Sequence, residues 1–332
     1  MDILLVKHGA EQFLAAEGAR KGVAFSRTTP GILSAPDRVS DTRDYSFPFW
    51  ILHDAVHLDL QQGTRPVDAA CNWFCEKIRV RRIDTAWSLF WLSGNDNGFT
   101  PAVSKQEQVR ETLKKRISRI SKLAESTFPA TDVPVFGLFV AESASAGMLY
   151  AATAATFCGQ HRMKDDPVAP SRSYLKIEEA FSIYGTSPML RSTVVELGAA
   201  PGGWTWAALK RGAKVFAIDN GPLKKGPLDH PDVEHHCSDA FNWKPAVPPV
   251  DWLFCDMVQK PQPVVERVRT WFSEGWCRNA VVNFKFGYSD PVEILKMIHG
   301  PKGFARYCET LLCRHLFHDR DEITVMAKIK MQ

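Results

Sequence analysis

Apolar positions in the first 160 residues recur with two different spacings, which predict both strands and helices. Short β-branched or aromatic runs predict strands at 3–6, 86–91, 135–140 and 148–152. Apolar residues three or four positions apart predict helices at 11–21, 67–77 and 105–124. Residues 27–44, rich in Thr, Pro, Ser and Asp, predict a loop. This half of the chain is therefore expected to be α+β.

After residue 172 the pattern changes to strands that alternate with glycine turns and helical stretches. A helix is predicted at 173–181, strands are predicted at 193–197, 214–219, 233–239, 251–256 and 280–285, and a hairpin is predicted from 311–317 and 322–327. Strands that alternate with helices are typical of a mostly parallel, Rossmann-like sheet. The closing hairpin would add one antiparallel strand to that sheet.

Residues 161–172, HRMKDDPVAPSR, are polar, contain two prolines and predict a linker. A chain of 332 residues has room for two or three domains at about 150 residues each. We expect a small ferredoxin-like region over 1–62, a second α+β region over 63–165 and the Rossmann-like domain over 166–332.

The composition narrows the class of protein. Hydrophobic residues make up 45% and charged residues 23% of the chain, as in ordinary globular proteins. No apolar run reaches the roughly 18 residues of a membrane helix, and the first residues lack a signal-peptide pattern. Cys71 and Cys75 have no second pair near them, so reduced thiols are favoured over a metal site. These features favour a cytoplasmic protein that needs no metal.

The net charge of +4 is too small to indicate a nucleic-acid binder, so the distribution of charge matters more. Lysines and arginines crowd the polar face of the helix predicted at 105–124, against only Glu107 and Glu111. That face is either a solvated surface or one that faces RNA phosphates. The sequence alone leaves both interpretations open.

The most informative stretch is Thr193 to Trp204, TVVELGAAPGGW. It predicts a strand, a tight glycine turn and the start of a helix, an arrangement that lets a nucleotide-like cofactor approach the backbone. The spacing differs from the G-x-G-x-x-G of dinucleotide-binding folds, which disfavours a dehydrogenase.

This motif resembles motif I of the FtsJ-type 2'-O-ribose methyltransferases, which bind S-adenosyl-L-methionine. The resemblance implies one set of cofactor-binding residues: Ser173, Glu196, Gly198, Ala200, Pro201, Gly202, Gly203, Trp204, Asp219, Asp239 and Asp256. Glu196 stands where the family usually has aspartate, and Ala200 where close relatives have cysteine. Asp219 ends the second predicted strand of this domain, where an acid can accept hydrogen bonds from a ribose.

Four charged residues follow the order of the family's catalytic tetrad: Lys176, Asp256, Lys285 and Glu322. Asp256 and Lys285 end neighbouring predicted strands, and Glu322 begins a strand that reaches the same edge only if it runs antiparallel. The resemblance makes Lys285 the base that takes the proton of a ribose 2'-hydroxyl, with the other three positioning it. Singly, each residue could be an ordinary surface charge.

The N-terminal half resembles a THUMP-type RNA-binding domain in the order of its elements. Together the two halves resemble the ribosomal large-subunit 2'-O-ribose methyltransferase M family. That resemblance implies methylation of a cytidine of large-subunit (23S) ribosomal RNA. Methylation of transfer RNA or of an mRNA cap, or a non-catalytic RNA-binding assembly factor, are the alternatives. Nothing in the sequence indicates an oligomeric state.

Overall fold

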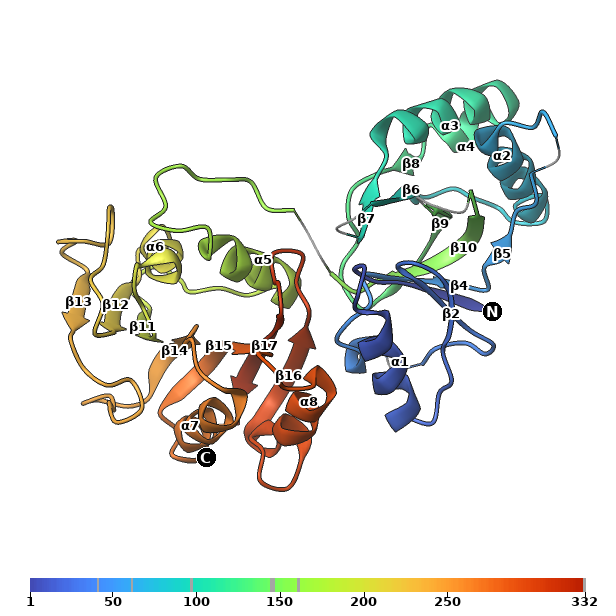
Figure 1. The fold of residues 1–332 in the computed structure, drawn as a ribbon. Helices are drawn as coiled ribbons and strands as arrows, with labels where there is room; N and C mark the ends of the chain where they lie inside the picture. The colour runs from blue at the N-terminus through green and yellow to red at the C-terminus, as the bar shows by residue number, and fades with distance from the viewer. Residues whose placement is uncertain (41, 61, 96–97, 144–146, 160–161, 331–332) are drawn as a thin grey trace. The chain divides into compact units, whose positions relative to one another are not determined.

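The structure is a computed structural model that describes residues 1–40, 42–60, 62–95, 98–143, 147–159 and 162–330 (Figure 1). The first residue of the predicted linker, 161, lies outside this part. The chain divides into two compact units, Met1–Gly159 and Gln160–Gln332. Each unit is mixed α/β and is built on a sheet of its own.

The first unit is built on one mixed sheet of ten strands. Its main path runs β2-β3-β1-β4-β10-β9-β6-β7. The strands are β1 (Asp2–Leu5), β2 (Ser26–Thr29), β3 (Ile32–Ala35), β4 (Trp50–His53), β5 (Val56–His57), β6 (Trp87–Asn95), β7 (Gly98–Pro101), β8 (Ala124–Glu125), β9 (Pro134–Glu142) and β10 (Leu149–Phe157). Strand β4 pairs with β10, so elements from both sides of the predicted boundary at residue 62 share this sheet. The three-domain division itself stays a prediction.

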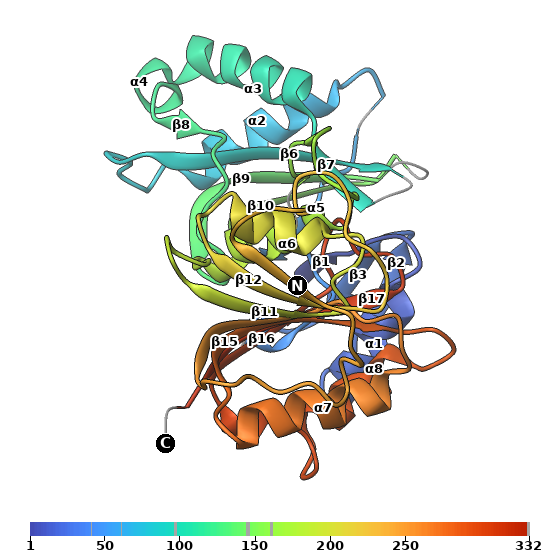
Figure 2. The ribbon, with the colours of Figure 1, turned by 90° about the vertical axis from the view of Figure 1, so that its left-hand side faces the viewer.

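Strands β6 and β9 bury side chains on both faces. Leu89 and Trp91 contribute to one apolar core, and Phe90 and Leu92 to another. This alternation follows from the two-residue period of a strand. Helices α2 (Pro66–Lys77), α3 (Val103–Arg116) and α4 (Ser118–Ser121) cover the first of these cores, as Figure 2 shows. The second contains Trp50, whose ring lies 5.0 Å from that of Phe90 and 4.7 Å from that of Phe157.

Two predictions for this unit need correction. The segment 27–44 is not all loop, because β2 and β3 form a hairpin there, with Ile32 and Leu33 buried. The helix predicted at 105–124 ends at Arg116, and Ile117 adopts φ −142° and ψ 56°. Helix α4 follows this break; beyond it, Trp87 donates a hydrogen bond to the carbonyl of Ile120, and β8 pairs with β6.

The second unit is a seven-stranded sheet in the order β13-β12-β11-β14-β15-β17-β16. Its strands are β11 (Thr193–Leu197), β12 (Lys214–Ile218), β13 (Val233–His236), β14 (Val250–Cys255), β15 (Cys277–Lys285), β16 (Cys308–Arg314) and β17 (Glu322–Ile329). The first five are parallel, and β17 runs antiparallel to β15. The order reverses between β11 and β14, which is where open sheets of this type bind ligands.

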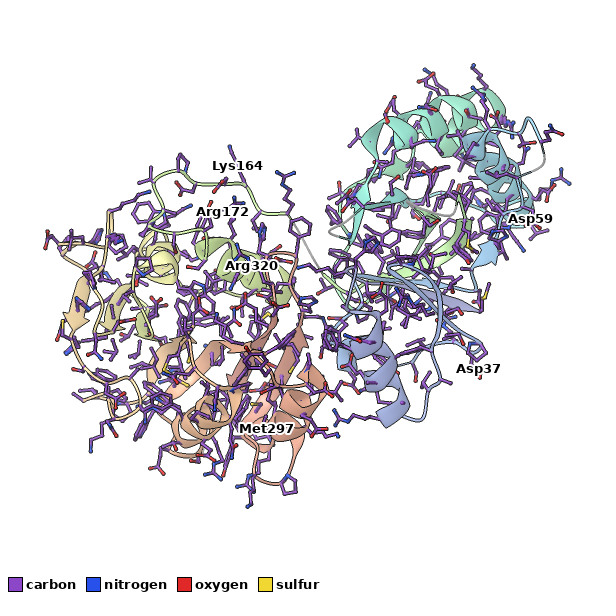
Figure 3. The ribbon with its side chains drawn as sticks, viewed as in Figure 1. Asp37, Asp59, Lys164, Arg172, Met297 and Arg320 are labelled. Atoms are coloured by element: carbon purple, nitrogen blue, oxygen red, sulfur yellow. The ribbon has the colours of Figure 1, made fainter. Side chains whose placement is uncertain are left out.

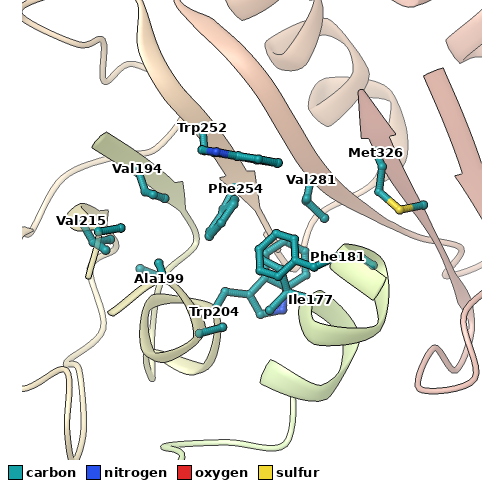
Figure 4. Close-up of a cluster of buried hydrophobic side chains, with 14 of the residues drawn as sticks. Ile177, Phe181, Val194, Ala199, Trp204, Val215, Trp252, Phe254, Val281 and Met326 are labelled. Carbon is teal, nitrogen blue, oxygen red and sulfur yellow. The ribbon is translucent and has the colours of Figure 1, made fainter. Parts of the chain in front are cut away.

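Helices cover both faces of this sheet (Figure 1). Helices α5 (Tyr174–Tyr184) and α6 (Gly203–Leu209) lie on one face, and α7 (Pro261–Ser273) and α8 (Pro291–His299) on the other. Under α5 and α6, Phe181 and Trp204 pack against Phe254 of β14, as Figure 4 shows. This core fixes α5 and the glycine turn against the carboxyl ends of the strands.

The described helices include none that is long and apolar enough to cross a lipid bilayer. Among the described residues no group of three or more His, Cys, Asp or Glu side chains is arranged to hold a metal ion. Cys71 and Cys75 are free thiols on α2, and burial raises the pKa of Cys71 to about 12. Burial therefore favours the neutral thiol at Cys71.

Candidate active site

The glycine turn after β11 brings three segments close together. Gly198 has φ +81°, and a Cβ atom there would lie 3.0 Å from the backbone of Met257. A Cβ atom on Gly203 would lie 2.2 Å from the hydroxyl of Ser173, so only glycine fits without a shift. The indole N–H of Trp204 donates to the carbonyl of Ser173 at 3.0 Å. The turn, α6 and the start of α5 therefore form one tightly packed corner.

Beside this turn lies a cavity of about 190 Å³ at the carboxyl ends of the strands. Three predicted cofactor residues line it: Gly198, Asp219 and Asp239. The segment after β14, including Met257, Val258 and Gln259, completes the wall. A cavity in the crevice where the strand order reverses is the expected position for a nucleotide-like ligand.

Asp219 and Asp239 also organise the backbone around the cavity. One carboxylate oxygen of Asp219 accepts from the amide of Ala200 at 2.9 Å, and the other from the amide of Gly221 at 2.7 Å. Asp239 accepts from the amide of Phe241 at 2.9 Å. Each carboxylate oxygen has a second lone pair, so these bonds leave room for hydrogen bonds to a ligand.

Glu196 lies deeper than the cavity. Its side chain is buried and accepts a hydrogen bond from the hydroxyl of Thr205 at 2.5 Å. Burial raises the pKa of Glu196 well above its usual value, and the charges of Asp256 and Asp219 add to the effect. In this structure Glu196 ties β11 to α6 and does not line the cavity. Its contribution to cofactor binding stays a prediction.

The structure brings Lys176, Asp256, Lys285 and Glu322 together. The register pairs Lys285 directly with Glu322 across β15 and β17, because β17 runs antiparallel. The Lys285 amine forms ion pairs with Asp256 and with Glu322, the latter at 2.7 Å. The Lys176 amine, from α5, pairs with the other oxygen of Glu322. Glu322 therefore bridges the two lysines.

The electrostatics of this tetrad keep Lys285 protonated. Burial favours the neutral amine, but the charges of Asp256 and Glu322 outweigh burial and raise the pKa of Lys285 above its usual value. For Glu322 the balance is similar: burial disfavours its charge, while Lys285 and Lys176 lower its pKa to about 2. Near neutral pH, Lys285 is therefore an ammonium group and Glu322 a carboxylate.

The comparison with protein families identifies this part of the chain. Residues 169–286 match the FtsJ-like methyltransferase family. This region is therefore similar to FtsJ-like methyltransferases. The match includes the glycine turn, Lys176, Asp256 and Lys285, and it ends before Glu322.

Two curated relatives carry the name ribosomal RNA large subunit methyltransferase M. The protein of Xanthomonas oryzae pv. oryzae (strain PXO99A) is 43% identical over 179 residues, which cover 51% of this chain and 50% of that protein. The protein of Laribacter hongkongensis (strain HLHK9) is 45% identical over 174 residues, covering 49% and 48%. The chain thus spans about half the length of the curated relatives it matches.

Solved structures show weaker likeness. The Methanococcus jannaschii fibrillarin pre-rRNA processing protein aligns with a TM-score of 0.38 at 14% identity, covering 56% of this chain and 81% of its own. A putative hemolysin from Streptococcus thermophilus aligns with a TM-score of 0.41 at 13% identity, covering 68% and 83%. Likeness at this level does not establish a shared fold.

The second unit also holds its β16–β17 connection with residues that sequence patterns do not reveal. Buried Glu179, on α5, accepts from the backbone amides of Phe317 and His318 at 2.8 and 3.0 Å. Asp319 accepts a hydrogen bond at 3.0 Å from the hydroxyl of Thr324, which lies two residues after Glu322 on β17. These contacts fix the direction in which Glu322 enters its strand.

Positive charge gathers around this connection. His318 accepts a hydrogen bond from the amide of Met163 at 2.9 Å, and burial together with the charges of Arg172 and Arg162 lowers its pKa to about 4. Arg172 precedes α5 and Arg320 lies in the β16–β17 connection; Figure 3 labels both. Arg172, Arg162 and Arg320 are exposed. No motif in the sequence points to this group, since its members meet only in the folded domain.

Proposed function

We propose that this protein is an S-adenosyl-L-methionine-dependent RNA methyltransferase that modifies a ribose 2'-hydroxyl of large-subunit ribosomal RNA. The observation that carries the proposal is the Lys285 amine, held between Asp256 and Glu322 at the strand edge that also forms the cavity. The FtsJ-like family match and the two relatives named as ribosomal RNA methyltransferases support the reaction and the substrate class.

The cavity fits the proposed cofactor in its donor and acceptor chemistry. Asp219 has acceptor capacity for a ribose diol, and Asp239 for an adenine amine. Gly198 leaves the cavity wall without a side chain. Ser173, Ala200, Pro201, Gly202, Gly203 and Trp204 would act by forming the turn that shapes this wall. S-adenosyl-L-methionine, when bound, supplies an electrophilic methyl group.

The chain's own residues then have to position and deprotonate the hydroxyl. Lys176 and Glu322 hold the Lys285 amine at a fixed point, and Asp256 approaches it from the neighbouring strand. Because the two carboxylates keep Lys285 protonated, its amine must lose a proton before it can accept one from the ribose. The rate should therefore rise with pH over the neutral range.

The first unit would hold the RNA. The order of its elements supports a THUMP-like RNA-binding function, with residues 1–62 as a ferredoxin-like part and 63–165 as the THUMP-like part. A cytidine is the nucleotide that the family resemblance favours. Transfer RNA or cap methylation, and a binding-only assembly factor, are the alternatives that mapping of the modified nucleotide would separate.

The decisive experiment replaces the proposed base. Lys285→Ala leaves the glycine turn intact, so S-adenosyl-L-methionine and RNA should still bind. Methyl transfer to large-subunit ribosomal RNA should fall by about 10²–10⁴-fold, the usual effect of a positioned general base. Lys296→Ala, which removes a half-exposed lysine paired with Glu293 on α8, is the matched control and should retain activity. Equal activity of both variants would refute the proposed base.

A second experiment tests the acceptor atom. A 2'-deoxy substitution at the methylated nucleotide removes the nucleophile, and transfer should disappear. Methylation of a base would be unaffected by that change. Mapping 2'-O-methyl positions in ribosomal RNA and transfer RNA incubated with the protein identifies the substrate. Absence of transfer to every RNA, with binding retained, would favour the assembly factor.

A further inference from the structure

The first unit contains a basic cavity that no part of the proposed catalytic site uses. It has a volume of about 300 Å³ and lies where the loop after α2 meets the beginnings of β6 and β9. Its lining includes Arg81 and Arg82 from the loop, Trp87 and Ser88 from β6, Phe136 from β9 and one carboxylate, that of Glu125 on β8. Cationic, hydroxyl and aromatic groups thus converge in one small space.

Arg81 lies against an aromatic ring of the sheet. Its guanidinium carbon lies 3.7 Å from the centroid of the Phe136 ring, so the two planar groups are in contact. Among the described residues, no carboxylate forms an ion pair with Arg81, although its side chain is exposed. The Phe136 ring in turn packs near the ring of Phe74, with centroids 6.3 Å apart and an interplanar angle of 29°. The outer face of the Arg81 guanidinium is therefore available for a flat ligand.

The neighbouring arginines leave an excess of positive charge. Arg82 and Arg119 both form ion pairs with Asp84, so one carboxylate serves two guanidinium groups. Their side chains are 86% and 77% exposed, which leaves their other N–H donors free to contact a ligand. An anion beside this cavity would meet two fork-shaped donors.

The site is anchored on rigid elements. Trp87 is buried, its backbone amide donates to Leu123 and its indole N–H to Ile120. Those bonds hold the α4–β8 segment, which carries Arg119, against the start of β6. Because the sheet positions Phe136 and the segment positions Arg119, the cavity does not depend on a flexible loop alone.

We propose that this cavity binds one unpaired nucleotide of single-stranded RNA, with its base stacked on the Arg81 guanidinium and its phosphates on Arg82 and Arg119. The ligand class rests on the proposed function. Unpaired bases commonly stack on arginine planes and aromatic rings, and arginine contacts phosphate with two donors. The second unit would act on RNA that the first unit holds through this contact.

The test measures the affinity of the whole chain for a fluorescent single-stranded oligoribonucleotide and for an RNA duplex of the same length, across a series of salt concentrations. Arg81→Ala should weaken binding of the single strand by about tenfold or more, the usual effect of losing a base stack. The salt dependence should change little, because the phosphates contact Arg82 and Arg119; Arg82→Ala should instead lower it by about 0.7 in log–log slope, since one phosphate contact is lost. Binding of the duplex should change little.

Two further variants separate stacking from charge. Arg81→Lys keeps the positive charge but loses the planar guanidinium, so the affinity for the single strand should fall while the salt dependence of binding stays unchanged. Phe136→Leu should also weaken binding, because the guanidinium loses its support. Arg27→Ala removes a positive charge from an exposed side chain on β2 and should have little effect. Wild-type affinity of Arg81→Lys, or an equal loss for duplex and single strand, would overturn the proposal.

This result is independent of the catalytic test. If Lys285→Ala abolishes methyl transfer while Arg81→Ala binds and methylates RNA normally, the cavity proposal fails and the proposed function stands. If Arg81→Ala loses single-strand affinity while wild-type protein transfers no methyl group, the proposed function fails and the cavity proposal stands.

Discussion

The two units place their charged side chains in contrasting ways. In the first unit, two basic residues of α3, whose polar face could be either solvated or RNA-facing from the sequence, form internal contacts. Arg110 donates to the carbonyl of Ala124 and to Ser126, and Arg116 donates to Asn72. In the second unit, Lys176 and Lys285 meet carboxylates at the carboxyl edge of the sheet. Basic residues on a predicted helix are therefore weak evidence for an RNA-binding surface. A lysine predicted at the carboxyl end of a parallel strand is stronger evidence for an active site.

The strands explain this difference. Strands β6 and β9 of the first unit pack apolar side chains into cores on both faces. In the second unit the sheet is parallel through β15, so the carboxyl ends of these strands share one edge. That edge collects Asp256 and Lys285 without any loop having to adopt a special shape.

The largest effect should come from breaking the core of the first unit alone. Trp50→Ala removes a ring that contacts Phe90 and Phe157 and should cost about 3–5 kcal/mol of stability. Because the two units have separate cores, S-adenosyl-L-methionine should still bind. Scanning calorimetry of Trp50→Ala with and without the cofactor measures both the loss of stability and the retained binding. Trp204→Ala, in the second unit's core, should instead reduce cofactor affinity. Loss of cofactor binding in Trp50→Ala would show that the units are coupled.

Removing an acid from the cavity of the second unit should have an intermediate effect. Asp219→Ala loses the proposed hydrogen bonds to the cofactor and should weaken its binding by about 1.5–3 kcal/mol, measured by titration calorimetry. Asp232→Ala, on the exposed segment before β13, is the control and should bind normally. Undiminished affinity of Asp219→Ala would refute its place in the cofactor site.

The tetrad should make the stability of the second unit sensitive to acid. The pKa of Glu322 is lowered from 4.5 to about 2, so its stabilising contribution is present above pH 4.5 and is lost as pH falls toward 2. Denaturant unfolding from pH 7 to 3 should show Glu322→Gln less stable at neutral pH, with the gap narrowing in acid. Glu309→Gln, in an exposed ion pair with Lys328, should show almost no gap. A gap that stays constant with pH would contradict the lowered pKa.

The smallest effect concerns the surface of α3. Lys115 is exposed, so Lys115→Glu should leave the fold intact. If α3 faces RNA, this charge reversal lowers the salt dependence of RNA binding by at most the amount expected for about two phosphate contacts. The salt dependence is measured as the slope of log affinity against log salt concentration. Lys214→Glu on the second unit controls for net charge. An unchanged salt dependence would make α3 a solvated face and leave the Arg81 cavity as the basic site of the first unit.

The sequence by itself was sufficient for the order of the strands in the second unit. Hydrophobic runs that end in Glu196, Asp219, Asp256 and Lys285 predicted the parallel strands, because local apolar runs and glycine turns specify this kind of sheet. The pattern did not reveal α7 or α8, although α7 places Val264, Val268 and Trp271 on a buried face. The prolines at both ends of its first turn obscured a helix that proline can begin.

Other features depended on contacts between residues far apart in the chain. The helix predicted to continue through Ile117 breaks there, and the residues after it are held to β6 by the indole of Trp87 and by β8. The raised pKa of Lys285 required the register that pairs it with Glu322, 37 residues later. The contact of Arg81 with Phe136 joins a loop to a strand 55 residues away. Local spacing specifies which elements form, but only folding decides which side chains meet, since strand register and packing are set by the whole sheet.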